Sequence, residues 1–273
     1  MDYPRVRWID AHPFVSEGKE MVLLNDVEGI MENSLIVSKD ILFLISLMDG
    51  SHSLRDIQAE YMRTYGELLY MERLKEIIAA MDESCLLFNE TYSARLAHLK
   101  MEYENLPVRK SALAGRSYPA SRMDLITALD EMFKNAPEKK LAGDLTAILA
   151  PHIDYSRGIN VYRQIYPYLR HINKPLVVLL GTCHNMTERV WNISLKDFET
   201  PLDIVPVKQE LRSLIRQNKV LNDYIIEWPH RKEHSIELQI PLLQFNMLND
   251  FEILPILTGS MHEYIEGIKD IKD

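Results

Sequence analysis

Residues 175–184, Pro175-Leu-Val-Val-Leu-Leu180-Gly-Thr-Cys-His184, decide the fold of the second part of this 273-residue chain. A continuous Val/Leu run that stops at a glycine is typical of a strand buried on both faces of a sheet. Helical patterns separate it from two similar runs, Leu145-Thr-Ala-Ile-Leu-Ala150 and Phe251-Glu-Ile-Leu-Pro-Ile-Leu257. Buried strands that alternate with helices predict an α/β domain, a three-layer and mostly parallel sheet with helices on both faces.

Two histidines directly follow predicted strands. His152 comes after the run at 145–150, and His184 comes after the run at 175–180. Ligands bind beyond the carboxyl ends of the strands in open α/β sheets, and neutral imidazoles at neighbouring strand ends can share one cation. The sequence therefore makes His152 and His184 candidate metal ligands, although two ordinary polar loop residues would give the same pattern.

A third candidate is the stretch Glu233-His-Ser-Ile-Glu237, where a helix is expected to begin. His234 and Glu237 lie one turn apart on one face, so they can form a proton shuttle beside a metal or bind it directly. An ordinary first helical turn, in which a carboxylate favours the positive helix end, explains the same residues. His230 and His234 also have the i, i+4 spacing of zinc ligands, which is a weak signal by itself.

Residues 1–90 predict a separate small α+β domain. Extended runs at 21–24 and 34–37 precede three amphipathic helical patterns, over about residues 38–48, 54–65 and 70–82. Three small helices followed by a short return strand, expected at Cys85-Leu-Leu-Phe88, are typical of a winged helix. A further helical pattern indicates a linker, so the expected organisation is a winged helix at 1–90, a helical linker at 91–106 and the α/β domain at 107–273.

The net charge of −9 lies wholly in the first part of the chain, because residues 1–106 hold 10 Lys and Arg against 19 Asp and Glu. An acidic surface repels phosphate, so we expect no nucleic-acid partner. The apolar runs are too short to cross a bilayer and the N-terminus has no apolar signal segment, so we expect no membrane partner. Two cysteines, Cys85 and Cys183, provide no disulfide framework, which favours a cytoplasmic location.

Six motifs, in order along the chain, resemble those of the Memo family, also called AmmeMemoRadiSam system protein B. They are Arg109-Lys-Ser-Ala-Leu-Ala-Gly-Arg-Ser-Tyr-Pro119, Ala150-Pro-His-Ile-Asp-Tyr155, Gly181-Thr-Cys-His184, Glu199-Thr-Pro-Leu202, Glu233-His-Ser-Ile-Glu-Leu-Gln-Ile-Pro-Leu-Leu243 and Ile253-Leu-Pro-Ile-Leu257. The resemblance implies a fold similar to class III extradiol dioxygenases. It also implies that His152 and His184 bind a metal, Fe²⁺ or another divalent ion such as Zn²⁺ or Cu, and that His234 lines the pocket.

The first part resembles a PqqD-type winged helix at Val37-Ser-Lys-Asp-Ile-Leu42 and Leu47-Met-Asp-Gly-Ser-His-Ser-Leu-Arg-Asp-Ile57. Domains of this type bind leader peptides or partner enzymes beside radical-SAM proteins. The resemblance therefore implies a radical-SAM protein or a peptide as a partner of residues 1–90, and it is compatible with an oligomer.

Two departures from the Memo pattern affect the site. Ile153-Asp154 stands where the family has Ala-Gly. The family also continues with a Ser-Asp-Leu-Ser-His segment and a Cys-Gly motif whose cysteine completes the metal site, and neither occurs in residues 1–273. We therefore expect a fragment or a variant with an incomplete site. Two imidazoles alone predict weak metal binding, although Asp154 or Cys183 can substitute for the third ligand.

Two functions remain open at this point. One is a metal-dependent, iron-using oxidoreductase of dioxygenase-like fold that works with a radical-SAM system, with His234 and Glu237 as catalytic residues. The alternative is a non-catalytic scaffold that binds a peptide or protein in such a system.

Overall fold

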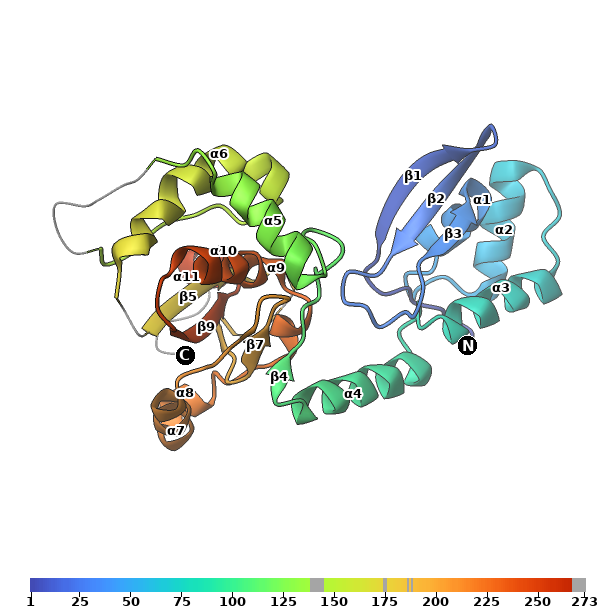
Figure 1. The fold of residues 1–273 in the computed structure, drawn as a ribbon. Coiled ribbons are helices and arrows are strands. Elements are labelled where there is room, and N and C mark those ends of the chain that lie inside the picture. The colour runs from blue at the N-terminus through green and yellow to red at the C-terminus, as the bar shows by residue number, and fades with distance from the viewer. Residues whose placement is uncertain (138–144, 174–175, 186, 188, 267–273) are drawn as a thin grey trace. The chain divides into compact units, whose positions relative to one another are not determined.

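The computed structural model describes residues 1–137, 145–173, 176–185, 187 and 189–266, and it divides the chain into two compact units, Met1–Glu102 and Tyr103–Asp273 (Figure 1). Helix α4 (Glu90–Asn105) covers the segment for which the sequence predicts a helical linker. No helix in the described ranges is long and apolar enough to span a membrane.

The first unit combines an antiparallel sheet with three helices. Its elements are β1 (Asp10–Ser16), β2 (Lys19–Asn25), β3 (Leu35–Ser38), α1 (Lys39–Ser46), α2 (Leu54–Tyr65) and α3 (Met71–Glu83). The strands pair in the order β1-β2-β3. The sequence pattern indicates β2, β3 and the helices but not β1, because β1 contains Pro13 and six of its seven residues are exposed, so it has no apolar alternation.

The core of the first unit comes from one face of each element. Leu24 of β2 and three helical residues, Leu44, Ile57 and Leu74, are fully buried in one cluster. Ser53 caps α2 by accepting a hydrogen bond from the Asp56 N–H, and the Asp56 carboxylate accepts the Ser53 N–H in return. This reciprocal cap explains why α2 begins where the serine stands.

Gly66 ends α2 with φ +68°, and a Cβ added there would meet nothing within 4 Å. We expect Gly66→Ala to lower the free energy of unfolding by about 1 kcal/mol, because an alanine in the left-handed region is strained even where space is free. Urea denaturation of the full chain measures this. Glu67→Ala, at an exposed neighbour, is the control that should change little, and an unchanged unfolding midpoint in Gly66→Ala would contradict the backbone explanation.

The second unit holds the remaining elements. Its helices are α5 (Arg122–Phe133), α6 (Tyr155–Ile165), α7 (Gln209–Gln217), α8 (Lys219–Asn222), α9 (His234–Glu237), α10 (Gln239–Asn246) and α11 (His262–Ile265), with 3-10 turns at Tyr166–His171 and Trp228–Arg231. Its strands are β4 (Val108–Arg109), β5 (Leu176–Thr182), β6 (Trp191–Ile193), β7 (Asp197–Glu199), β8 (Ile204–Val205) and β9 (Glu252–Thr258).

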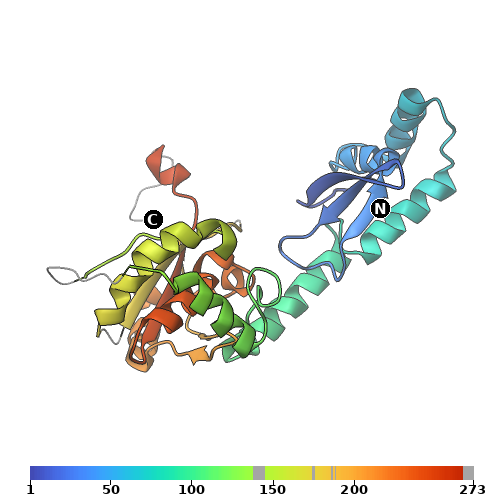
Figure 2. The same cartoon turned by 45° about the horizontal axis from the view of Figure 1, so that its top comes forward.

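Two small mixed sheets form in the second unit. The larger has the order β5-β9-β6, with β5 parallel and β6 antiparallel to β9, and the other has the order β4-β7-β8. One face of β5 and β9 packs on α5, α6 and α10, which lie together in Figures 1 and 2. On the opposite face, Leu254 and Ile256 of β9 pack against a small cluster that includes Ile215 of α7, whereas Val178 and Leu180 of β5 are exposed. The expected α/β class is therefore present, but the sheets are mixed rather than mostly parallel.

The predicted strand at residues 145–150 is wrong, because these residues form no strand in the structure. Leu145, Ile148 and Ala150 do pack against the core cluster, but Leu149 is 93% exposed. An apolar run becomes a strand only when a neighbouring strand accepts its ladder of hydrogen bonds, and this segment has none among the described residues. The prediction of a buried strand thus fails on both counts, since the segment is no strand and none of its six residues is fully buried, although three of them contact the core.

Candidate metal centre

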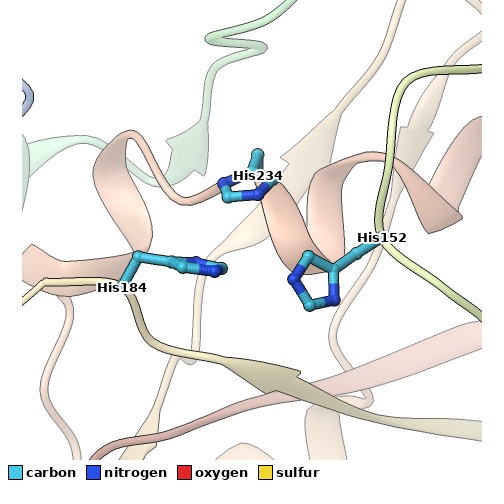
Figure 3. A group of neighbouring side chains, drawn as sticks. All are labelled: His152, His184 and His234. Carbon is cyan, nitrogen blue, oxygen red and sulfur yellow. The ribbon is translucent and has the colours of Figure 1, made fainter.

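Three imidazoles converge at the carboxyl end of β5. His152 lies in the loop before α6, His184 follows β5, and His234 is the first residue of α9 (Figure 3). One ligand-type nitrogen from each ring lies within 4.8 Å of the others. The ring centroids are 5.2 Å apart for His152 and His184, 5.4 Å for His152 and His234, and 4.4 Å for His184 and His234. The structure thus groups the two predicted ligands and adds His234 to them.

Close packing of β5 on α9 brings His184 and His234 together. Gly181 has no side chain, and a Cβ there would lie 2.6 Å from atoms of both Ser235 and Ile236. The Ser235 hydroxyl donates to the carbonyl of Thr182 at 2.8 Å, which fixes α9 against the strand end. The glycine in the Gly-Thr-Cys-His sequence is therefore required by close backbone approach.

Glu233 orients two of the three imidazoles. Its Oε1 lies 2.9 Å from Nδ1 of His184 and 3.1 Å from Nδ1 of His234, and the carboxylate also accepts the N–H groups of both histidines. Its side chain is 2% exposed. A carboxylate that holds Nδ1 fixes the tautomer of a histidine and directs Nε2 to a metal. The Glu233 carboxylate therefore orients the rings of both His184 and His234, which leaves the Nε2 atom of each ring available to a metal ion.

Tyr162 holds the loop that carries His152. Its hydroxyl lies 2.7 Å from the carbonyl oxygen of Ile153 and 3.1 Å from that of Pro151, and it accepts the Ile153 N–H at 3.2 Å. The ring passes over Gly158, where a Cβ would lie 2.3 Å from a ring carbon. The side-chain amide of Gln239 also donates to the Pro151 carbonyl. The backbone on both sides of His152 is thus fixed from α6 and α10.

We expect Tyr162→Phe to weaken divalent-metal binding by about tenfold, because it frees the loop on which one ligand stands without touching any ligand. Stability should fall by only about 1–2 kcal/mol, the effect of removing one buried hydroxyl. Tyr103→Phe is the matched control, since the buried Tyr103 hydroxyl has no hydrogen-bond partner among the described residues. Calorimetric titration with Zn²⁺ measures the affinity, and equal affinities for the two variants would contradict the role of Tyr162.

Charges at the site favour a neutral His152 and a protonated His234 beside an ionised carboxylate. Burial, followed by the nearby His234 and His184, lowers the pKa of His152, which keeps its lone pair free near neutral pH. Burial by itself raises the pKa of Glu233, but hydrogen bonds from His234, from the His184 backbone and ring and from Ser235 together hold that pKa far below its usual value. The hydrogen bond with Glu233 raises the pKa of His234. A cation that displaces the His234 proton would therefore be balanced by the Glu233 charge.

Glu237 takes part in a different network. Its carboxylate pairs with Arg109 and accepts hydrogen bonds from the Ala112 N–H, the Leu113 N–H and the Tyr118 hydroxyl. Arg109 also donates to the carbonyls of His230 and Glu233. Both charged side chains are buried, at 0% and 1% exposure. These partners of Glu237 thus fix residues 109–118 to α9, and its predicted role as a proton shuttle stays a prediction.

The other predicted ligands lie outside the histidine group. Within the described residues, Asp154 and Cys183 are not among the ligand atoms that gather with the three histidines. The Cys183 thiol lies 3.4 Å from the Asn185 carbonyl, and burial raises its pKa, which disfavours a thiolate. His230 is buried, its Nε2 lies 2.9 Å from the Asn192 carbonyl, and burial lowers its pKa to about 4. The i, i+4 pair of His230 and His234 is therefore not a shared site.

A pocket of about 290 Å³ opens beside the histidines and is lined by two of them, His152 and His234. Apolar walls come from Leu113, Ile153 and Leu238, and charged side chains come from Asp154, Arg157 and Lys232, with Ser117 completing the lining. A molecule in this pocket would reach a metal held by the histidines from one side.

Sequence reasoning assigned no role to Glu233, Tyr162 or Arg109. Glu233 offers a local signal, because it directly precedes His234 and accepts the first N–H groups of α9. Tyr162 and Arg109 act through partners 9 to 11 and 121 to 128 residues away, and no spacing rule predicts such contacts.

Comparison with known proteins places these residues in a family. The family model described as Memo-like protein matches residues 109–267, which contain all three histidines, Glu233 and Glu237. This chain belongs to the Memo-like family. A MEMO1 family protein of Aquifex aeolicus is 30% identical over 260 residues, which cover 94% of this chain and 66% of that protein.

Other Memo-like relatives match a little over half of this chain. A second MEMO1 family protein of Aquifex aeolicus is 33% identical over 151 residues, covering 55% of this chain and 54% of that protein. One from Thermoplasma volcanium is 29% identical over 163 residues, covering 58% of each chain. This Memo-like chain thus spans between 54% and 66% of the length of these three relatives.

Proposed function

We propose that the second unit binds one divalent metal ion through His152, His184 and His234. The observation that supports this is the group of three imidazoles, two of them oriented by one buried carboxylate. Three protein nitrogens with open positions are a common catalytic arrangement, and imidazole suits Fe, Zn and Cu alike. From the sequence we expected two histidine ligands and therefore weak binding of a divalent metal ion. With His234 as a third ligand, we expect the affinity for the metal that is usual for a site with three protein ligands.

We further propose that the metal is iron and that the protein is a non-haem oxidoreductase with the three-layer fold of extradiol dioxygenases. Bound Fe²⁺ would supply the redox chemistry. The residues of this chain would do the rest: Glu233 holds the protons on Nδ1 of His184 and His234, and Tyr162 fixes the loop of His152. The pocket lined by Leu113, Ile153 and Leu238 would exclude part of the water from the open side.

Anaerobic titration of the full chain with Fe²⁺, and with Zn²⁺ as a redox-inert ion, tests the metal site. We expect one ion per chain, with affinity reduced at least a hundredfold in each of His152→Ala, His184→Ala and His234→Ala. His262→Ala, which removes an exposed histidine of α11, is the control. Electron paramagnetic resonance with nitric oxide then detects an open position on the bound Fe²⁺. Stoichiometric binding that survives the three alanine variants would place the site elsewhere.

The alternative is a non-catalytic scaffold that binds a peptide or a radical-SAM protein through a PqqD-like winged helix in the first unit. The observation in its favour is β1, an edge strand whose backbone pairs only with β2 in the described part of the sheet. An exposed edge strand can accept a peptide as an additional strand. A chain that takes up neither Fe²⁺ nor Zn²⁺ in the titration would favour this scaffold over the enzyme.

A further inference from the structure

Two apolar walls of the pocket beside the histidines are fixed by the core of the second unit. Leu113 and Leu238 both line this pocket. Leu238 is 2% exposed, and its carbonyl accepts a hydrogen bond from the buried Tyr155 hydroxyl at 2.7 Å. The Leu113 N–H donates to the buried Glu237 carboxylate at 2.8 Å. The backbone of neither wall can retreat without leaving a buried polar group unpaired, which is costly.

The third apolar residue of the lining, Ile153, is also held in place. It directly follows His152 and is 42% exposed. The Tyr162 hydroxyl lies 2.7 Å from the Ile153 carbonyl oxygen and accepts the Ile153 N–H at 3.2 Å, so one side chain holds both polar groups of this residue. A side chain that branches at Cβ is also stiff at χ1. The isoleucine can therefore neither move with its backbone nor readily turn away from the pocket.

The small size of the pocket makes a fixed side chain in its lining important. The volume is about 290 Å³, at the small end of the roughly 300–1,000 Å³ range of ligand pockets. In an apolar pocket, one methylene group more or less changes the discrimination between ligands by about 10–200-fold. A rigid isoleucine beside His152 therefore has a large effect on which molecules can enter.

We propose that Ile153 is the specificity-determining residue of this pocket and that it limits the ligand to a small molecule with a compact apolar body. The body of the ligand lies against Leu113, Leu238 and Ile153, and one donor atom reaches the side of the pocket where His152 and His234 stand. The inference rests on the proposed metal site only for that donor atom, which approaches the bound ion. Ile153 discriminates by a clash with larger molecules rather than by a preferred contact.

Imidazole and 4-phenylimidazole are suitable probes, because they share a donor nitrogen and differ by one phenyl ring. The visible absorption bands of Co²⁺ bound to the full chain report whether either probe reaches the ion. We expect Ile153→Ala to tighten the binding of 4-phenylimidazole by about tenfold or more and to leave that of imidazole within about twofold, because only the larger probe meets the isoleucine. Ile204→Ala is the matched control, since Ile204 is 45% exposed on β8 and lies outside the lining.

Failure of this inference can be told apart from failure of the metal site. Binding of 4-phenylimidazole that is unchanged or weaker in Ile153→Ala, or that tightens equally in Ile204→Ala, would overturn the role of Ile153 while the Co²⁺ bands still show the ion. A chain that takes up no Co²⁺ would overturn the metal proposal instead. Saturation-transfer NMR on the metal-free chain then tests Ile153: tighter binding of 4-phenylimidazole in Ile153→Ala alone would support its role, and equal binding in the wild type and both variants would overturn it.

Discussion

Replacing Glu237 with glutamine is expected to lower the free energy of unfolding of the second unit by about 3–5 kcal/mol. Glutamine keeps one carbonyl oxygen but loses the charge that balances the fully buried Arg109. Its amide group would also face the donors that now reach both carboxylate oxygens, the N–H groups of Ala112 and Leu113 and the Tyr118 hydroxyl. An uncompensated buried charge costs far more than the surface ion pairs of this chain contribute.

Urea denaturation of the full chain measures this loss, with Glu210→Gln as the control. Glu210 lies on α7 with a side chain that is 72% exposed, so its substitution should change the free energy of unfolding by less than about 0.5 kcal/mol. The double variant Arg109→Met with Glu237→Met should recover part of the stability, since it removes both buried charges. A Glu237→Gln protein as stable as the wild type would instead favour the predicted role of Glu237 as a proton shuttle.

Glu233→Gln is expected to weaken divalent-metal binding by about 10–100-fold. The substituted side chain can no longer accept hydrogen bonds from the Nδ1 atoms of both His184 and His234 with an ionised oxygen, so both imidazoles lose their fixed tautomer. The negative charge that balances a bound cation disappears as well. The effect should therefore exceed that of Tyr162→Phe, which acts on the backbone beside one ligand.

The control for Glu233→Gln is Glu227→Gln. Glu227 is another carboxylate of the second unit, half-buried where Glu233 is buried, and it accepts hydrogen bonds from the Ser194 hydroxyl and the Leu195 N–H rather than from a histidine. Its substitution removes the same charge and should leave the metal affinity within about twofold of the wild type, a shift well below that of an oriented ligand. Competition with a chromogenic chelator measures both affinities, and similar losses in the two variants would mean that net charge, not ligand orientation, controls binding.

The sequence predicted the parts of this fold that depend on local patterns. The apolar runs at 175–180 and 251–257 overlap β5 and β9, and Ser53 and Gly66 mark the ends of α2. The run at 145–150 misled the prediction, because an apolar run forms a buried strand only where a neighbouring strand pairs with it, and this segment is neither a strand nor fully buried. β1 gave no signal, since its exposed residues lack the alternation that a half-buried strand shows.

The candidate metal site was predictable only in part, because local sequence patterns do not show how distant elements pack together. Placement after apolar runs was enough to select His152 and His184, and the group of three imidazoles contains both. Where His234 stands relative to them depends on the packing of α9 on β5, which Gly181 permits and which no spacing rule encodes. The resemblance to the Memo family supplied motifs in order, and the family match over residues 109–267 agrees with them.

The parallel pairing of β5 with β9 has a consequence for the kinetics of folding. Leu176 and Glu252 are partners in this ladder although 75 residues separate them in the sequence. His184 and His234 come together only after α9 has packed against the end of β5. Long loops must close before such contacts form, so the ladder is expected late on the folding route. An ion held by the three imidazoles would then bind after the rate-limiting barrier. The bound ion would slow unfolding and leave the folding rate nearly unchanged, because it would stabilise the native state but not the transition state of folding.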